Sequence, residues 1–306
     1  MPELPEVETV RAGLEPVLRG RSFVRVEQRR PDLRFPLPER FAERLTGRRV
    51  LRLGRRAKYI LLHLDRDEVL AIHLGMTGRL IVSCGEATDE GGSTRRAAGA
   101  GIALGQYEYS HGKDARHDHL VFTMSGGAVV TYNDARRFGY MTLIPAGELD
   151  RGAFFAGLGV EPLGPDLTGA YLARRARGKK VDLKAYLMDQ RIVAGLGNIY
   201  VCEALFRAGL GPWKAAARLA TRGGRPTPAA ERLAAAIKAV LADAIRAGGS
   251  SLRDYRRTDG SSGLFQNELS VYGRADAPCA RPGCRGTVRR KTQGGRSTFF
   301  CPVCQR

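Results

Sequence analysis

The sequence predicts an α+β protein whose secondary structure changes class along the chain. After one N-terminal helix, short β-type runs separated by turn residues continue to about residue 145. From about residue 150 the apolar residues recur at helical spacing, and four of the six cysteines lie in the last 28 residues. We therefore divide the 306 residues into a β domain at 1–150, a helical domain at 151–270 and a cysteine-rich domain at 271–306.

The N-terminal segment, residues 2–19, has the pattern of a helix with one buried face. Pro2 and Pro5 suit a first helical turn, and the acidic residues beside them complement the positive end of the helix dipole. The apolar residues at helical spacing are Val7, Val10, Leu14, Val17 and Leu18.

The next part of the chain is rich in β-type runs. These are RSFVRVEQ, RRVLRLGRR, KYILLHL, EVLAIHL, HDHLVFTM, GAVVTYND and FGYMTLIP. Many short strands are typical of a sandwich or of a barrel, and the sequence alone leaves both open. Residues 85–115 interrupt the pattern with a stretch rich in Gly, Ala, Ser and Thr, which we interpret as a surface insertion.

The following part has helical patterns. They are DRGAFFAGLG, TGAYLARRARG, DLKAYLMDQR, NIYVCEALFRAG and PAAERLAAAIKAVLADAIRAG. Between the third and fourth, Gly195 to Asn198 form a turn, and the free N–H groups of a helix that begins there can bind a phosphate. A glycine C-cap followed by an ordinary asparagine N-cap gives the same sequence, and this stretch alone favours that simpler interpretation.

The C-terminal cysteines have the spacing of a metal site. Cys279-x4-Cys284 is followed by Cys301-x2-Cys304, and the segment between the pairs has β-type runs around Gly294-Gly295. Four thiolates leave no open coordination position, so we expect one structural Zn²⁺ held by two cysteine knuckles and a β-hairpin. Unpaired or redox-active cysteines are the alternative.

The charge indicates a polyanionic partner. Fifty Lys and Arg against 31 Asp and Glu give a net charge of +19, although a genome-wide enrichment in arginine gives the same excess. No run of about 20 apolar residues is present, and MPELPEVETV has acidic residues where a signal peptide has basic ones. We therefore expect a cytoplasmic protein that binds no membrane.

Several motifs occur together and in order along the chain. They are PELPEVETV, KYILLHL, HLGMTG, HDH, NDARRFG, LMDQRIVAGLGNIY, SLRDY, DGSSG, VYGR and the terminal cysteine pairs. In this the chain resembles the formamidopyrimidine-DNA glycosylase family of bifunctional 8-oxoguanine glycosylases and AP lyases. The resemblance implies an N-terminal β-sandwich flanked by helices, a helix–two-turn–helix domain and a C-terminal zinc finger. It also implies a monomer that binds duplex DNA containing oxidised bases or abasic sites in a cleft between domains. Through this DNA the protein would associate with the nucleoid.

The resemblance implies a catalytic group at the start of the chain. Removal of Met1 would leave Pro2 with a secondary amine that attacks C1′ of the deoxyribose, expels the base and forms a Schiff base for β- and δ-elimination. Glu3 would act as general acid and base, and Lys58 would reach into the site and contact a DNA phosphate. On the simplest alternative, Pro2 and Glu3 only begin a helix and Lys58 is a solvated basic residue. Glu6 either contacts the extruded nucleotide or only complements the helix dipole.

The resemblance also implies two groups of DNA-binding residues. Met76, Arg136 and Phe138 would fill the space that the extruded nucleotide leaves and would read the orphaned base, unless the two apolar side chains only pack in the core. The second group would bind near the lesion and its phosphates, and consists of Lys184, Asn198 and Arg296. Lys184 could otherwise be a plain surface residue. Residues 258–268 match the loop that covers an extruded 8-oxoguanine, which favours oxidised purines as substrates.

Two other functions fit parts of the sequence. One is an endonuclease VIII-type glycosylase for oxidised pyrimidines, against which PELPEVETV and DGSSG argue. The other is a zinc-containing protein that binds damaged DNA without cutting it, and the presence of Pro2, Glu3, Lys58 and Asn198 argues against it. The chain departs from the family pattern in the four-residue spacing of its first cysteine pair and in Ala135, where proline is common.

Overall fold

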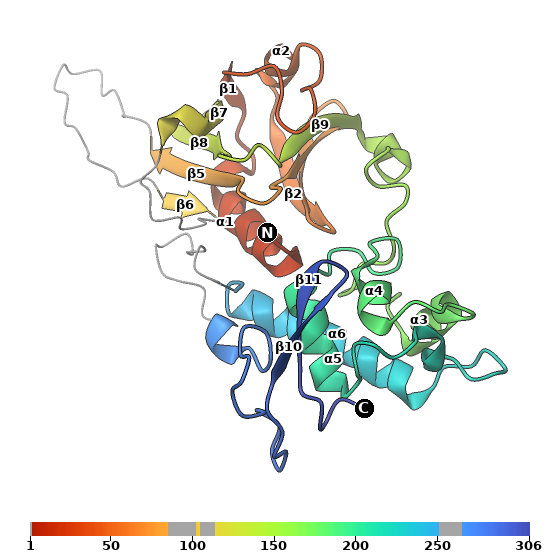
Figure 1. Cartoon of the computed structure of the whole chain (residues 1–306). Coiled ribbons are helices and arrows are strands. Elements are labelled where there is room, and N and C mark those ends of the chain that lie inside the picture. Colours follow the sequence, from red (N-terminus) through yellow and green to blue (C-terminus); the bar gives the residue numbers. More distant parts are fainter. Residues whose placement is uncertain (1, 85–101, 105–113, 251–264) are drawn as a thin grey trace. The chain divides into compact units, whose positions relative to one another are not determined.

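The computed structural model describes residues 2–84, 102–104, 114–250 and 265–306, which form two compact units (Figure 1). The first unit comprises Met1–Phe155 with Gly248–Leu264, and the second comprises Ala156–Ala247 with Phe265–Arg306. By this grouping the cysteine-rich end belongs to the second unit. The division into three domains stays a prediction.

The first unit begins with helix α1 (Leu4–Leu18) and contains two antiparallel sheets. One sheet has the strand order β1-β7-β8-β5-β6, with β1 Phe23–Gln28, β7 Asp118–Met124, β8 Ala128–Asn133, β5 Arg79–Cys84 and β6 Ile102–Leu104. The other has the order β2-β3-β4-β9, with β2 Val50–Arg56, β3 Tyr59–Leu64, β4 Glu68–His73 and β9 Tyr140–Pro145. Short helices α2 (Phe41–Leu45), η1 (Ala115–His117) and η2 (Ala146–Arg151) complete the described elements of this unit.

One hydrophobic core joins both sheets to α1, which makes the first unit a β-sandwich rather than a closed barrel. The buried face of α1 is the predicted one, with Val7, Val10, Leu14 and Leu18 almost without exposure. Alternate residues of the strands point into this core, as the period of two in their sequences requires.

The second unit is helical and ends in a β-hairpin (Figure 1). Its helices are α3 (Gly169–Ala176), α4 (Leu183–Met188), α5 (Asn198–Ala208), η3 (Ala216–Leu219), α6 (Pro228–Arg246) and η4 (Phe265–Glu268). Strands β10 (Arg289–Gln293) and β11 (Arg296–Phe300) pair antiparallel, with Gln293 opposite Arg296. Gly294 and Gly295 both have positive φ, of 56° and 72°, which the tight two-residue turn requires.

The helix predicted for DRGAFFAGLG is wrong. After the short helix η2, residue 152 is a bend, residues 153–157 form turns and residues 158–159 have no regular structure. Gly159 explains part of the difference, because a Cβ atom there would lie 2.2 Å from the carbonyl oxygen of Ile192. The backbone therefore approaches a second backbone segment more closely than a helix with side chains allows.

Two other predicted features are only partly described. Within the predicted insertion at 85–115, residues 102–104 form β6, which pairs with β5, and residues 114–115 are also described. The rest of that insertion, and residues 258–264 of the predicted lesion-covering loop, lie outside the described residues. Among the helices of the described ranges, none is both long enough and apolar enough to cross a bilayer.

Candidate active site

The start of α1 is a buried polar site. Pro2 is buried and directly precedes Glu3, the N-cap residue, whose N–H donates to Oε2 of Glu6 at 2.9 Å. The other carboxylate oxygen of Glu6 accepts from the N–H and the hydroxyl of Ser250, at 2.8 and 3.1 Å. Glu6 therefore closes a capping box at the helix start, and it also holds the chain at Ser250.

Lys58 lies in a two-residue turn between β2 and β3, immediately before β3. Ala57 has a φ of 51°, a left-handed conformation that is rare for a residue with a side chain, and Lys58 is only 8% exposed. Arg55 donates to the carboxylate of Glu8 at 3.0 Å and to the carbonyl oxygen of Ala57 at 2.9 Å. The turn that carries Lys58 is thus tied to α1, and Lys58 is not a solvated surface residue.

Met76, Arg136 and Phe138 lie on two loops, residues 74–78 and 134–139, which we call the paired loops. Their backbones touch: a Cβ atom on Gly75, whose φ is 64°, would lie 2.2 Å from the carbonyl carbon of Phe138. Phe138 is 39% exposed and Met76 is half-buried, and neither belongs to the core of the first unit. The Arg136 guanidinium lies 4.6 Å from the centre of the Phe138 ring.

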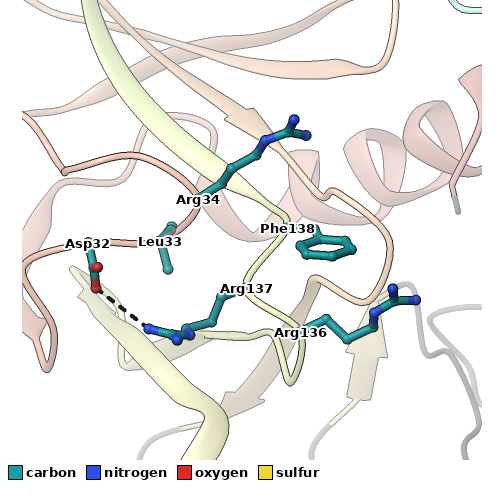
Figure 2. A pocket seen from close by; sticks show the side chains of 6 residues that line it. All are labelled: Asp32, Leu33, Arg34, Arg136, Arg137 and Phe138. Atoms are coloured by element: carbon teal, nitrogen blue, oxygen red, sulfur yellow. Dashed lines mark ion pairs between the residues drawn. The ribbon is translucent and has the colours of Figure 1, made fainter.

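An open cavity of about 440 Å³ lies beside these loops (Figure 2). It is lined by Asp32, Leu33, Arg34, Arg136, Arg137 and Phe138. The single carboxylate, on Asp32, lies 3.9 Å from the Arg137 guanidinium, so positive charge dominates the lining. A wall of arginines next to an exposed aromatic ring suits a nucleic-acid strand, which presents phosphates and base faces.

His73, at the end of β4, was not singled out from the sequence. Its ring stacks on Tyr140 with centroids 5.0 Å apart, and its Nδ1 accepts from the N–H of Gly75 at 3.0 Å. Burial, helped by the positive charges of Lys58 and Arg34, lowers the pKa of His73 from 6.5 to about 4. A neutral imidazole therefore supports the first of the paired loops near neutral pH.

In the second unit, the structure brings Lys184, Asn198 and the Arg296 strand together. The carbonyl oxygen of Ser297 accepts from Asn198 Nδ2 at 2.9 Å and from Lys184 Nζ at 3.3 Å. Lys184 Nζ also donates to Thr298 Oγ1 at 2.6 Å. Lys184 is buried, which lowers the pKa of its ammonium group, and it is not the plain surface residue that the sequence allowed. Arg296 itself is exposed.

The glycine turn before α5 is held by a residue that sequence reasoning missed. Gln190 accepts from the N–H of Gly195 and donates to the carbonyl oxygen of Leu196, both at 2.8 Å. Asn198 is the first helical residue and Gly197 is the N-cap, so Asn198 does not cap the helix. Its side-chain amide instead reaches the hairpin.

The four C-terminal cysteines form one cluster, with all sulfur atoms within 4.8 Å of one another. The Sγ atoms of Cys279 and Cys304, and those of Cys284 and Cys301, are 3.7 Å apart. Thiolates arranged tetrahedrally at the usual Zn–S distance are about 3.8 Å apart. The four residues can therefore hold one metal ion. The longer spacing of the first pair does not prevent this arrangement, and the other described cysteine with a defined side chain, Cys202, is buried in the core near Phe206.

Comparison with known proteins identifies the family. A model of the formamidopyrimidine-DNA glycosylase N-terminal domain matches residues 1–141, and a model of the H2TH domain of the same glycosylase matches residues 158–256. The chain belongs to the formamidopyrimidine-DNA glycosylase family. Formamidopyrimidine-DNA glycosylases from Chelativorans sp. (strain BNC1) and Methylocella silvestris are 55% and 54% identical to it, each over 100% of both chains.

Solved structures of this glycosylase family have the same fold. The chain covers 100% of Lactococcus lactis Fpg in complex with DNA that contains an abasic site, and is itself fully covered, with a TM-score of 0.80 at 32% identity. For the MutM (Fpg) protein from Thermus thermophilus the TM-score is 0.76 at 34% identity, over 99% of this chain and 98% of that one. The glycosylase fold expected from the sequence, with sandwich, helical domain and C-terminal hairpin, is thereby confirmed.

Proposed function

We propose that this chain is a base-excision repair enzyme that removes oxidised purines from duplex DNA and then cleaves the strand at the abasic site. The observation that carries the proposal is that a member of this family has the expected residues at the start of α1. This member of the glycosylase family has a buried proline at position 2, directly before the buried Glu3, and a helix follows that is tied to the Lys58 turn.

In the proposed reaction the amine of Pro2, exposed once Met1 is removed, attacks C1′ of the damaged nucleotide. The N–C1′ bond forms as the bond between C1′ and the base breaks, and the base leaves with the electron pair and takes up a proton. Glu3 protonates the ring oxygen so that the sugar opens to an iminium ion. The iminium withdraws electrons, so a proton leaves C2′ and the 3′ phosphate departs from C3′. A second elimination follows, in which a proton leaves C4′ and the 5′ phosphate departs from C5′.

The other predicted residues fit binding roles in this proposal. Lys58 would contact a phosphate beside the reacting sugar. Met76 and Phe138 would occupy the space of the extruded nucleotide, and Arg136 would hydrogen-bond the base left opposite it. The exposure of Phe138 supports this role, since a core residue would be covered.

In the second unit, Asn198 and Arg296 would hold phosphates near the lesion, and Lys184 would act in the same region. The metal in the cysteine cluster would be Zn²⁺, because four thiolates at tetrahedral spacing are a structural zinc site. When bound, it stiffens the loops beneath the hairpin, and no chemical step passes through it.

A trapping experiment tests the enzymatic proposal. Incubation with a duplex that contains 8-oxoguanine opposite cytosine, in the presence of borohydride, should reduce the iminium to a covalent protein–DNA adduct. Pro2→Gly should lower adduct formation by at least about 100-fold while changing DNA affinity little. Pro5→Gly, the same change three residues later in the first turn of α1, is the matched control and should keep adduct formation within about threefold.

Two results would reject parts of the proposal. A protein freed of Met1 that binds the duplex but forms no adduct would be a damaged-DNA-binding protein without catalysis. Faster cleavage of a duplex with an oxidised pyrimidine than of the 8-oxoguanine duplex would assign the chain the endonuclease VIII-type substrate range.

A further inference from the structure

A buried carboxylate, on Asp134, lies where the paired loops meet. The side chain of Asp134 has no exposure. One carboxylate oxygen accepts from the hydroxyl of Thr77, in the first loop. The other accepts from the N–H of Gly139, in the second loop, at 2.8 Å and from the hydroxyl of Tyr132 at 3.1 Å. A single group thus receives hydrogen bonds from both loops and from strand β8 beneath them.

The hydroxyl of Thr77 extends the connection. It accepts from the backbone N–H of Arg136 at 3.1 Å while it donates to Asp134. Thr77, which directly follows Met76, is therefore hydrogen-bonded to the backbone of Arg136. The burial of Tyr132 raises the pKa of its hydroxyl well above the ordinary value, so this group stays a donor to the carboxylate.

The two loops and strand β8 are closely packed where they meet. A Cβ atom on Gly78 would lie 2.3 Å from the carbonyl oxygen of Leu74, and one on Gly139 would lie 1.8 Å from the Tyr132 hydroxyl oxygen. Behind the carboxylate, His119 Nε2 donates to the backbone carbonyl oxygen of Asp134 at 2.9 Å. Neither loop can shift alone without breaking a buried bond to a charged group, which is among the stronger hydrogen bonds in proteins.

We propose that Asp134 is a positioning residue that locks the paired loops together, so that Met76, Arg136 and Phe138 enter DNA as one rigid wedge. This inference rests on the proposed function, because it explains what holds the wedge in place and adds no new reaction. Asp134 and Thr77 touch the loop backbones and not the reacting atoms. Their effect should therefore appear only where a nucleotide must be extruded from a duplex.

Thr77→Val tests the proposal most cleanly, because it removes the hydroxyl and keeps the shape. The duplex carries 2-aminopurine opposite a stable abasic analogue, so insertion of the wedge changes the fluorescence of the orphaned base. We expect Thr77→Val to slow this change, and excision of 8-oxoguanine opposite cytosine, by at least about tenfold. Strand cleavage at an abasic site in a single-stranded oligonucleotide needs no wedge and should stay within about twofold.

Matched variants and outcomes complete the test. Thr77→Ser keeps the hydroxyl and should restore the wild-type rates, and Thr131→Val, the same change on strand β8, should have no effect. Asp134→Asn should slow both duplex reactions at least as much as Thr77→Val does. If Asp134→Asn does not fold, the Thr77 variants alone decide the test. Equal losses on duplex and single strand, or no loss on the duplex, would overturn the role of Asp134. A wild-type protein that cleaves neither substrate would instead refute the proposed function.

Discussion

The paired loops of the first unit and the hairpin of the second unit present exposed arginines on rigid backbones, but they are held in opposite ways. A buried anion, Asp134, receives donors from both loops. The hairpin is held by a buried cation, Lys184, which donates to Ser297 and Thr298, and by the cysteine cluster at its base. In both regions the side chains that face the solvent, Arg136 and Arg296, are not the ones that carry the buried bonds.

Because the two regions are held by different groups, we expect them to respond to different perturbations. The carboxylate in the first unit depends on hydroxyl and amide donors, so small isosteric changes should loosen the loops without changing the charge at the surface. The hairpin depends on a metal site and an ammonium group, so it should respond to chelation and to loss of one positive charge.

Removal of the metal should have the largest effect. Structural zinc sites of this kind contribute on the order of 10 kcal/mol to the folding of their domain. We expect a strong chelator to expose the four thiols, to disorder the hairpin and to weaken duplex binding by at least about tenfold. Thiol titration and DNA-binding isotherms measure both effects. If all four thiols stay unreactive and affinity is unchanged, the hairpin does not depend on a metal.

Replacement of Lys184 by Met should have an intermediate effect. It leaves the buried acceptor Thr298 Oγ1 without its donor, and a lost buried hydrogen bond of this kind destabilises by about 1–3 kcal/mol. We expect lower DNA affinity but an unchanged dependence of affinity on salt, since the ammonium group faces the hairpin. The comparison is Arg296→Ala, which should reduce the slope of log affinity against log salt by about one. If Lys184→Met also reduces the slope by one, Lys184 contacts a phosphate directly.

The smallest predicted effect is on the pH dependence of the stability of the first unit. His73 has a folded-state pKa of about 4 against an ordinary value of 6.5, so the unfolded chain binds the proton first as the pH falls. The contribution of His73 is complete above pH 6.5 and is lost towards pH 4. Between pH 7.5 and 5 the free energy of unfolding should fall by about 2 kcal/mol more in the wild type than in His73→Asn. Urea unfolding at both pH values measures this difference; identical pH dependence would show that His73 is not desolvated.

Much of the fold was predictable because its elements are locally encoded. The period of two in the strands, the apolar face of α1 and the glycine pair of the hairpin each determine a structure within a few residues. The segment at 150–159 was mispredicted because its apolar residues alternate with glycines whose function is tertiary. Gly159 is small so that the backbone can pass Ile192, and no pattern within the segment shows that partner.

The residues alone pointed to side chains that lie at the surface or that cluster in sequence, whereas the buried Pro2, Glu3, Lys58 and Lys184 were named through the family resemblance. The cysteine pairs are of the first kind. Asp134, Gln190 and His73 were not singled out, because their roles come from partners that are distant in sequence or hidden in a turn. The glycines of HLGMTG and of ARRFG were the available signal, since closely spaced glycines often mark places where two backbones meet.

Mass spectrometry of the borohydride-trapped complex tests the central claim most directly. After digestion of protein and DNA, the reduced sugar remnant should be found on the nitrogen of Pro2, in a peptide that lacks Met1. A remnant on Lys58 or Lys184, or full activity in protein that retains Met1, would contradict the assignment of Pro2 as the nucleophile.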